Sequence, residues 1–276
     1  MVTTINIKGK LLDLSTPKVM GILNVTPDSF YENSRVSIEE DIVKQVQQMV
    51  TDGMDIVDVG GYSSRPGAKE VSLDDELRRV VPVVKIINEN FPLLPISIDT
   101  FRSNVAEEAV NVGAGIINDI SAGEMDERMF NLVAELQVPY IAMHMKGTPQ
   151  TMQKNPVYDD LMQEILLYFS EKVNKLRQLN VNDIILDPGF GFGKTLEHNY
   201  EILNKFELFQ NLDLPILTGV SRKSMINKVL GTTPDNALNG TTVLNTIALT
   251  RGTNILRVHD VKEAKQAVML FQKVIH

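Results

Sequence analysis

The sequence predicts an α/β protein, a single (β/α)8 TIM barrel with a short N-terminal β-hairpin. Three observations support this prediction. Eight short apolar segments rich in β-branched residues recur along the 276 residues, helical patterns separate them, and no linker, repeat or low-complexity stretch divides the chain. Doubly wound sheets usually have about five or six strands, so eight strands alternating with helices favour a barrel. Residues 1–276 are therefore expected to form one domain.

The predicted hairpin occupies the start of the chain. TTINIKGKLLDL (3–14) places Lys-Gly between two strand-like stretches, as in a tight turn. We expect this hairpin to lie ahead of the barrel and to plug its N-terminal end.

The eight predicted strands are near-continuous apolar runs rather than alternating ones. This pattern is typical of parallel strands that are covered on both faces. The segments are VMGILNV (19–25), DIVDVGG (55–61), PISIDT (95–100), GIINDIS (115–121), PYIAMHM (139–145), DIILDPG (183–189), PILTGVS (215–221) and NILRVHD (254–260).

The clearest helical pattern covers residues 37–53. Val46, Met49 and other apolar residues share one face, Ser37 is the expected N-cap and Gly53 the expected stop. Similar patterns cover residues 103–113 and 260–276, so helices are expected between the strands.

Composition excludes several classes of function. With 35 acidic and 27 basic residues, the chain carries a formal net charge of -8, which gives no global field for nucleic acid or an anionic membrane. The absence of cysteine excludes disulfides, thiolate nucleophiles and Cys-based metal sites. We expect a cytoplasmic protein, because the N-terminus lacks a signal-peptide pattern and no apolar run approaches the ~18 residues of a membrane span.

Candidate functional residues lie where the predicted strands end, because a barrel of this kind carries its active site at the C-terminal ends of its strands. Any one such residue could be only a helix cap or a turn former, but all eight ends carry one. In chain order they are Asn24, Asp58, Asp99, Asn118, His144, Asp187, Ser221 to Lys223, and Arg257 with His259.

A first sub-site follows from the short acceptors among them. Asp99, Asn118 and Asp187 could pair with the edge of a planar, donor-rich heterocycle such as a cyclic guanidine-amide. Lys223 could neutralise Asp187 and bond the ring carbonyl, with Met143 and Phe192 over the ring faces. In the simpler interpretation, Asp187 only caps its loop and Lys223 is a solvated helix residue.

A second sub-site would bind an anion. Arg257 and His259 alternate on the last strand and so face one side, and barrel closure brings them beside Asn24 on the first. A diphosphate bound there could share a Mg²⁺ ion, with Asn24 as one oxygen ligand and water supplying the rest. His259 alone is equally compatible with a capping or core histidine.

Two connections carry a third set of candidates. NVTPDSFYENSRV (24–36) and GGYSSRPGAKEVS (60–72) combine proline and glycine with Asp28, Phe30, Ser63, Ser64 and Arg65. This composition suits loops that close over a substrate and exclude water, although an irregular surface loop is the simpler alternative.

The segment DPGFGFGKT (187–195) is not a P-loop, because Pro188 stands where that pattern requires glycine. Its alternating Gly and Phe residues instead predict a tight turn that lets backbone approach a flat ligand. The histidines at 144, 198 and 276 show no metal-ligand spacing, which argues against a zinc site.

Taken in order, these motifs resemble the dihydropteroate synthases of folate biosynthesis over nearly the whole chain. The segments that carry the resemblance are MGILNVTPDSF (20–30), DVGGYSSRPGA (58–68), SIDT (97–100), NDIS (118–121), MHM (143–145), LDPGFGFGKT (186–195), SRKS (221–224) and RVHD (257–260). The resemblance implies condensation of 6-hydroxymethyl-7,8-dihydropterin diphosphate with 4-aminobenzoate to 7,8-dihydropteroate and diphosphate. It also implies Mg²⁺ as cofactor, inhibition by sulfonamides and a homodimer formed by late helices within 222–250.

The resemblance also assigns residues to roles. Asp99, Asp187, Lys223 and Asp28 would be catalytic, with Asp99 stabilising positive charge on the pterin along a dissociative path. Pterin contacts would come from Asp99, Asn118, Ile120, Met143, Asp187, Phe192, Gly219 and Lys223. Diphosphate contacts would come from Asn24, Arg65, Arg257 and His259, with Asn24 also on the metal. Contacts to 4-aminobenzoate would come from Phe30, Ser63, Ser64, Pro66, Phe192, Lys223 and Ser224.

Three departures from the family pattern lie in the two loops. Tyr62 stands where many members have Glu or a small residue, Ser64 where Thr is usual, and YENSRV (31–36) replaces a glycine-containing stretch. The last resembles sulfonamide-resistant synthases, so the drug response is left open. Two other functions are weighed: a methyltetrahydrofolate-binding methyltransferase and a non-catalytic pterin-binding paralogue. The loop residues and the Arg257 site argue against the first, and the intact motifs against the second.

Overall fold

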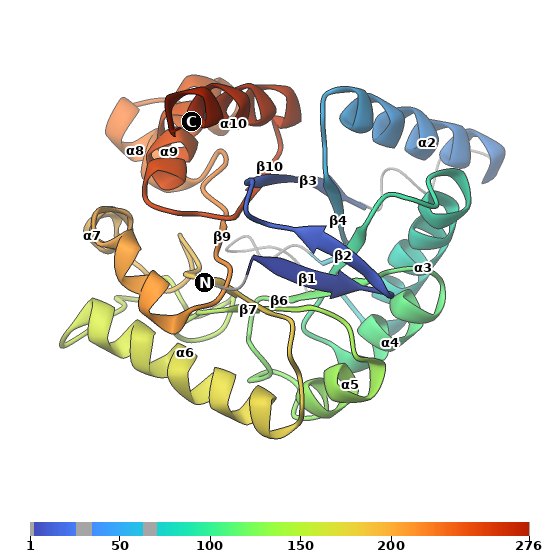
Figure 1. Ribbon diagram of the computed structural model, residues 1–276, viewed down its shortest axis with the longest axis horizontal. Coiled ribbons are helices and arrows are strands. Elements are labelled where there is room, and N and C mark those ends of the chain that lie inside the picture. Colours follow the sequence, from blue (N-terminus) through green and yellow to red (C-terminus); the bar gives the residue numbers. More distant parts are fainter. Residues whose placement is uncertain (1–2, 26–34, 63–70, 276) are drawn as a thin grey trace.

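The computed structural model describes residues 3–25, 35–62 and 71–275, and its centre is an eight-stranded parallel barrel (Figure 1). The strand order is β8-β7-β6-β5-β4-β3-β10-β9. A bridge between Leu186 and Ile216 closes the ring, and the Leu186 N–H donates to Pro215 O at 2.9 Å. The strands are β3 (Lys18–Asn24), β4 (Ile56–Gly60), β5 (Ile96–Asp99), β6 (Ile116–Asp119), β7 (Tyr140–Met143), β8 (Ile184–Asp187), β9 (Leu217–Thr218) and β10 (Ile255–Val258).

Seven strands of the barrel lie within predicted segments and β3 begins one residue before its segment, so the predicted fold class is confirmed. The predicted division into one domain stays a prediction.

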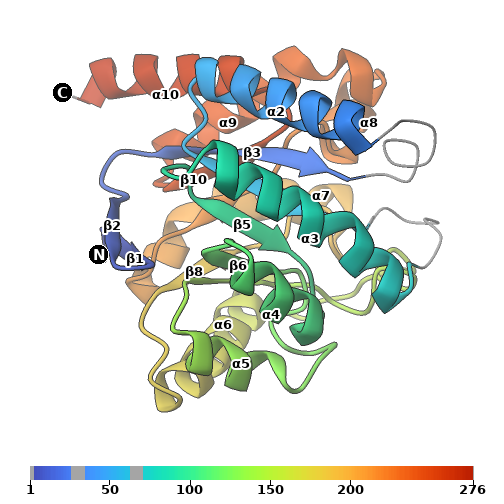
Figure 2. The same cartoon turned by 90° about the vertical axis from the view of Figure 1, so that its right-hand side faces the viewer.

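The N-terminal hairpin is also confirmed. Strands β1 (Thr4–Ile7) and β2 (Lys10–Asp13) pair antiparallel around Lys8 and Gly9, whose φ angles of 50° and 83° suit a two-residue hairpin turn. The hairpin lies at the end of the barrel where the strands begin (Figure 2).

The hairpin closes that end with apolar side chains. Ile5, Ile7 and Leu14 pack in one buried cluster against the first inward-facing residues of seven barrel strands. We call these seven residues the floor layer: Met20, Ile56, Ile116, Ile141, Ile185, Leu217 and Ile255.

Helices surround the barrel (Figure 1), and a second, larger apolar cluster fills the space between strands and helices. The helices are α2 (Arg35–Thr51), α3 (Leu73–Asn90), α4 (Ser103–Asn111), α5 (Met129–Leu136), α6 (Leu161–Gln178), α7 (Leu196–Asn204), α8 (Ser224–Leu230), α9 (Leu238–Thr250) and α10 (Val261–Ile275), with 3-10 turns at Phe206–Leu212 and Pro234–Asn236.

Of the two predicted ends of the first helix, the C-terminal one is confirmed and the N-terminal one is not. Gly53 follows the helix with φ 98°, and the Met54 N–H donates to Met49 O, so the predicted stop is confirmed. The N-cap prediction was wrong: α2 already begins at Arg35, two residues before Ser37, because the helix extends into the segment that the sequence assigned to the loop.

No helix among residues 3–25, 35–62 and 71–275 is long and apolar enough to cross a membrane. The predicted cytoplasmic location stays a prediction.

Candidate active site

Strand alternation decides which strand-end side chains enter the barrel. Since side chains of a strand alternate between its faces, the residue two positions after each floor-layer residue also points inward. Four of these seven residues are polar: Asp58, Asn118, Asp187 and Arg257. Together with Asp99 of the intervening strand β5, they form what we call the mouth layer. The structure therefore brings together all three predicted acceptors of the heterocycle site.

His144 is the exception among the strand-end candidates. It directly follows inward-facing Met143 and points outward, where its ring packs edge-on against Tyr168 at 4.9 Å. The prediction that it belongs with the other polar strand ends was wrong, because successive residues occupy opposite faces of the strand.

Arg257 is the hub of the mouth layer. Its Nε donates to Asp58 Oδ2 at 2.7 Å, and its terminal nitrogen donates to Asp99 Oδ2 at 2.5 Å. Asp58 is fully buried and accepts a further bond from Asn118 Nδ2 at 3.1 Å. In the structure the guanidinium predicted to bind diphosphate thus holds two carboxylates, one of which is expected to contact the pterin.

The surroundings of Asp99 disfavour its charged form. Burial raises the pKa of this carboxyl to about 7, while Arg257 opposes the rise and the nearby Asp58 adds to it. A carboxyl whose pKa lies close to neutral pH inside a site is a candidate for participation in catalysis.

Asp187 and Lys223 face each other across the site without a direct ion pair within 4 Å. Asp187 accepts from the Gly189 N–H at 2.7 Å, so it does cap its own turn. Lys223 Nζ donates to Phe190 O and lies 4.9 Å from the Phe192 ring centroid. Burial lowers the pKa of Lys223 to about 8, opposed by the charge of Asp187, and burial raises the pKa of Asp187.

Apolar side chains form the wall beside these charges. Ile120, Met143 and Phe192, all predicted pterin contacts, belong to one cluster at the mouth. Its other members are Tyr62, Phe101, Met145 and Met152. The rings of Tyr62 and Phe101 meet edge to face at 5.1 Å. The cluster offers flat apolar surface next to hydrogen-bonding groups, as a planar heterocycle requires.

Gly219 leaves space between two of the charged groups. A Cβ at this position would lie 3.9 Å from both the Arg257 Cβ and Lys223 Nζ. Any larger side chain would therefore fill the gap between these two cations.

The predicted anion sub-site lies at the rim. His259 and Asn24 are exposed; Asn24 ends β3, and His259 directly follows the neighbouring strand β10. His259 Nδ1 lies 3.0 Å from Ser221 Oγ, and the same hydroxyl accepts from the His259 N–H at 3.2 Å. Within the described part of the chain, no group of three or more His, Asp or Glu side chains is arranged to hold a metal ion.

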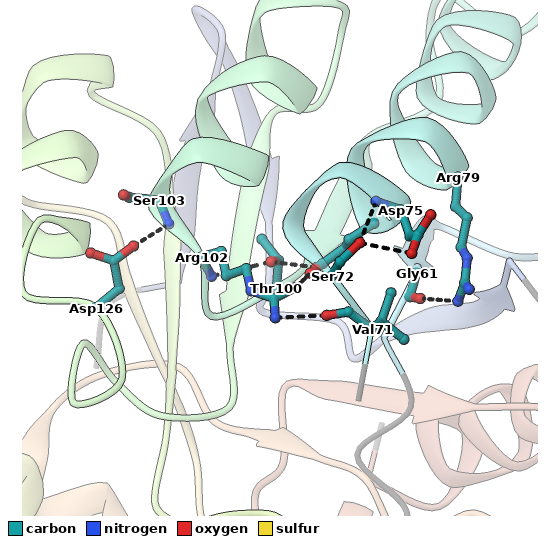
Figure 3. A network of polar contacts seen from close by, with 10 residues as sticks. Gly61, Val71, Ser72, Asp75, Arg79, Thr100, Arg102, Ser103 and Asp126 are labelled. Carbon is teal, nitrogen blue, oxygen red and sulfur yellow. Dashed lines mark hydrogen bonds and ion pairs between the residues drawn. The ribbon is translucent and has the colours of Figure 1, made fainter. Parts of the chain in front are cut away.

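A network at the edge of the site braces β4, α3 and β5 (Figure 3). Arg79 donates to Gly61 O at 3.1 Å, and Arg102 donates to Val71 O at 2.8 Å. Glu76, which is fully buried, accepts from Arg102 at 2.5 Å and from the Thr100 hydroxyl at 2.7 Å. Two arginines thus fix the backbone on both sides of residues 63–70.

Of the remaining predicted residues, the structure describes one and does not describe six. Ser224 is exposed at the start of α8. The predictions for Asp28, Phe30, Ser63, Ser64, Arg65 and Pro66 fall on residues that the structure does not describe.

The sequence reasoning missed the role of Asp58. The strand pattern marks it only as a polar strand end, yet Asp58 accepts hydrogen bonds from both Arg257 and Asn118. The alternation of DIVDVGG could have placed it inward, since Val57 and Val59 flank it on the outer face.

Comparison with known proteins agrees with this arrangement. Residues 20–259 match the family model described as pterin binding enzyme. The chain is 44% identical over 270 residues to dihydropteroate synthase of Escherichia coli K12, which covers 97% of this chain and 95% of that protein, and 40% identical to the Haemophilus influenzae enzyme over 95% of this chain and 96% of that one.

Two solved structures share the whole fold. A Yersinia pestis dihydropteroate synthase with a sulfonamide drug superposes with a TM-score of 0.92 at 39% identity, covering 99% of each chain. A Xanthomonas albilineans dihydropteroate synthase with 4-aminobenzoic acid gives 0.91 at 36% identity, covering 100% of this chain and 99% of that one. The chain belongs to the pterin-binding enzyme family, among the dihydropteroate synthases.

Proposed function

We propose that the protein condenses 6-hydroxymethyl-7,8-dihydropterin diphosphate with 4-aminobenzoate, giving 7,8-dihydropteroate, diphosphate and a proton. The observation that carries this proposal is the mouth layer: carboxylate and amide acceptors, an arginine and an apolar wall meet at one end of the barrel. Relatives at about 40% identity over nearly their whole length are named as dihydropteroate synthases.

Asp99, Asn118 and Asp187 would accept from the guanidine-amide edge of the pterin, with the ring between Met143 and Phe192. Lys223 would bond the pterin carbonyl. Because the leaving diphosphate departs from a carbon next to an electron-rich ring, a dissociative path places positive charge on the pterin, which the Asp99 carboxylate would stabilise. The aniline nitrogen then forms the C–N bond and loses its proton.

Arg257 would connect the binding of the diphosphate to the state of the Asp99 carboxylate. To bind the diphosphate, its guanidinium would exchange at least part of its contact with Asp99 for phosphate oxygens. That exchange would free the Asp99 carboxylate when the pterin arrives. His259 at the rim would add a second donor to the leaving group.

Mg²⁺ would be held by the Asn24 carboxamide and by diphosphate oxygens and water. The residues fit this role, because Mg²⁺ often keeps most of its waters and takes few protein ligands, and Asn24 presents an exposed amide at the rim. When bound, the ion would neutralise charge on the departing diphosphate. We expect Asn24→Ala to raise the Mg²⁺ concentration needed for half-maximal binding of inorganic diphosphate by about tenfold.

Sulfonamides would compete for the 4-aminobenzoate position. The three departures in the loops bear on this affinity and not on the reaction. Inhibition by sulfamethoxazole, measured beside KM for 4-aminobenzoate, determines whether the drug is discriminated from the substrate.

The proposed homodimer would use late helices. Val229 and Leu230 of α8 and Val243 and Ile247 of α9 are large apolar side chains with 38 to 57% of their surface exposed, a pattern that favours an interface. We expect light scattering to give twice the chain mass, and Val243→Glu to give the monomer.

The direct test of the reaction measures diphosphate release with each substrate alone and with both together. We expect release to depend on 4-aminobenzoate and to yield one dihydropteroate per diphosphate. Pterin binding without release would favour a non-catalytic paralogue, whereas methyl transfer from methyltetrahydrofolate would favour the methyltransferase.

A further inference from the structure

The turn that follows β8 is held by side chains at every carbonyl from residue 190 to residue 193. Four side chains supply the donors: Lys194 from the turn itself, Gln153 and Tyr158 from the segment between β7 and α6, and Lys223 from the start of α8. The turn is therefore bonded to two other segments of the chain. Phe190 O accepts from Lys223, Gly191 O from Gln153 at 2.6 Å, Phe192 O from Lys194 at 3.0 Å and Gly193 O from Tyr158 at 2.7 Å.

The turn is also pressed against the chain that follows β7. Gly189 and Gly193 have φ angles of 69° and 63°. A Cβ on Gly189 would lie 2.0 Å from His144 O, and a Cβ on Gly193 would lie 2.5 Å from Lys146 O. Only glycine permits this approach. The position of the turn is thus set by the residues that follow β7, including His144.

The buried side chain of Lys194 connects the turn after β8 to the residues that follow β7. It is 3% exposed, and its ammonium reaches His144 Nδ1 at 2.9 Å, His144 O at 3.2 Å and Phe192 O at 3.0 Å. These three acceptors match the three protons of an ammonium group. Among the described residues, no carboxylate lies within ion-pair distance of it, and burial lowers its pKa.

Such a buried cation is costly, and an apolar side chain of the same length would fill the space without that cost. Stability therefore does not account for Lys194. What the lysine alone provides is a set of directional bonds, and one of them ends on the backbone of Phe192.

His144 is suited to accept the bond from Lys194. Its ring packs against Tyr168 and points away from the barrel interior. Burial and the charge of Lys194 lower its pKa to about 2. The neutral imidazole is therefore favoured, and its tautomer with the proton on Nε2 accepts the bond from Lys194 at Nδ1.

We infer that Lys194 and His144 are positioning residues that fix Phe192 within the active-site wall. The inference rests on the proposed function, in which the Phe192 ring contacts both substrates. Phe192 also lies beside Lys223, so its placement sets the face along which both the pterin and 4-aminobenzoate enter. Neither positioning residue touches substrate.

The first experiment compares the unmodified enzyme with Lys194→Met. We expect KM for both substrates to rise about tenfold or more, with kcat within about threefold, because a displaced wall weakens binding before it affects the charged groups. The melting temperature should stay the same or rise. Unchanged KM values in a folded variant would overturn the inference, whereas an inactive unmodified enzyme would overturn the proposed function instead.

Two substitutions at His144 separate positioning from packing. His144→Asn can present its side-chain oxygen near the former Nδ1 but lacks the ring, whereas His144→Phe keeps a ring against Tyr168 but has no acceptor. We expect the Asn variant to keep KM within about threefold and the Phe variant to match Lys194→Met. The opposite order would show that His144 acts only through packing.

A third measurement reports on Phe192 itself. The chain contains no tryptophan, so Phe192→Trp introduces a single fluorophore. Adding Lys194→Met to this variant should lower the anisotropy of the indole and increase its quenching by acrylamide about twofold. Identical anisotropy and quenching in both backgrounds would contradict a positioning role.

Discussion

The two ends of the barrel use the same strands for opposite purposes. On four of them the first inward residue belongs to the apolar floor layer and the next inward residue, two positions later, to the polar mouth layer. The pairs are Ile56 and Asp58, Ile116 and Asn118, Ile185 and Asp187, and Ile255 and Arg257. Two residues span about 6.6 Å of strand, and over that distance the barrel changes from a packed core to a reactive site.

The difference between the ends is energetic. The floor layer gains free energy from apolar burial beneath the hairpin. The mouth layer instead holds carboxyls whose pKa burial raises, Asp99 and Asp187. One buried oxygen of Asp58 also has no hydrogen-bond partner among the residues that the structure describes. Substitutions at the floor should therefore affect folding, and substitutions at the mouth should affect chemistry.

The largest effect is expected at the mouth. Asp99→Ala should lower turnover at least a thousandfold, about 4 kcal/mol of transition-state stabilisation, because it removes the group that faces the developing pterin cation. Its melting temperature should change little, since Arg257 keeps Asp58 as a partner. Steady-state kinetics and thermal denaturation test this, and a variant that retains most of its kcat would refute the role of Asp99.

The second effect is expected at the floor. Leu14 directly follows β2 and is fully buried where the hairpin packs on the floor layer, so Leu14→Ala should lower the free energy of unfolding by about 3 kcal/mol, while KM and kcat at low temperature stay unchanged. Leu11 on the same hairpin is 73% exposed, and Leu11→Ala provides the matched control, with an effect within about 0.5 kcal/mol. A Leu14 variant with altered KM would show that the two ends are coupled.

Local sequence patterns were sufficient for the strands, for three of the helices and for most of the mouth layer. Apolar runs located all eight strands, and alternation, applied more strictly, would also have put His144 outside and Asp58 inside. The predicted set of acceptors, Asp99, Asn118 and Asp187, came together because parallel strands end at one edge.

The partners of long side chains could not be predicted in this way. Arg257 is 199 residues from Asp58 and 158 from Asp99 in the sequence, and its position at the end of a strand does not determine which neighbour across the barrel it meets. The same holds for Lys194, whose place in a rejected P-loop pattern gave no indication of its bond to His144.

The third prediction concerns Arg222, which adopts φ 56°, a left-handed conformation unusual for a residue other than glycine. It donates to both oxygens of Asp260, at 3.0 and 2.6 Å, and so ties the turn carrying Lys223 to the turn carrying His259. Arg222→Gly relieves the backbone strain but removes this clamp. We expect KM for the pterin substrate to rise about tenfold with little loss of stability.

Asp260→Asn is the matched partner of that variant. If the clamp matters, the two substitutions together should cost no more than either alone, because both break the same interaction. Effects that simply add would show that Arg222 and Asp260 act separately, and an unaffected Arg222→Gly would assign the residue a backbone role only.

The smallest effect is expected from a change of pH on kcat/KM. It tests whether the mouth layer controls activity independently of the stability of the fold. The proposed active form needs an Asp99 carboxylate and a Lys223 ammonium, whose pKa values lie at about 7 and about 8. The profile of kcat/KM should therefore be a narrow bell with its maximum near pH 7.5, falling about two- to threefold one pH unit to either side. Because these groups interact with each other and with Asp58, Asp187 and Arg257, the two apparent pKa values belong to the cluster as a whole.

Stability should follow the opposite course on the acid side of that bell. The folded pKa of Asp99 lies above its unfolded value of 3.8, so the stability contributed by its neutral form is present below about pH 4 and is lost as the pH rises through 7. Between pH 5 and 7 the activity should rise while the contribution of Asp99 to stability falls.

Two variants test this assignment. Lys223→Arg should remove the alkaline limb of the kcat/KM profile, since a guanidinium stays charged. Asp99→Asn should weaken the fall in melting temperature from pH 5 to 7. If the melting temperature of the unmodified enzyme instead rises together with its activity from pH 5 to 7, the acid limb of the activity profile reflects unfolding. The proposed division, in which the mouth layer determines activity and the floor layer determines stability, would then be wrong.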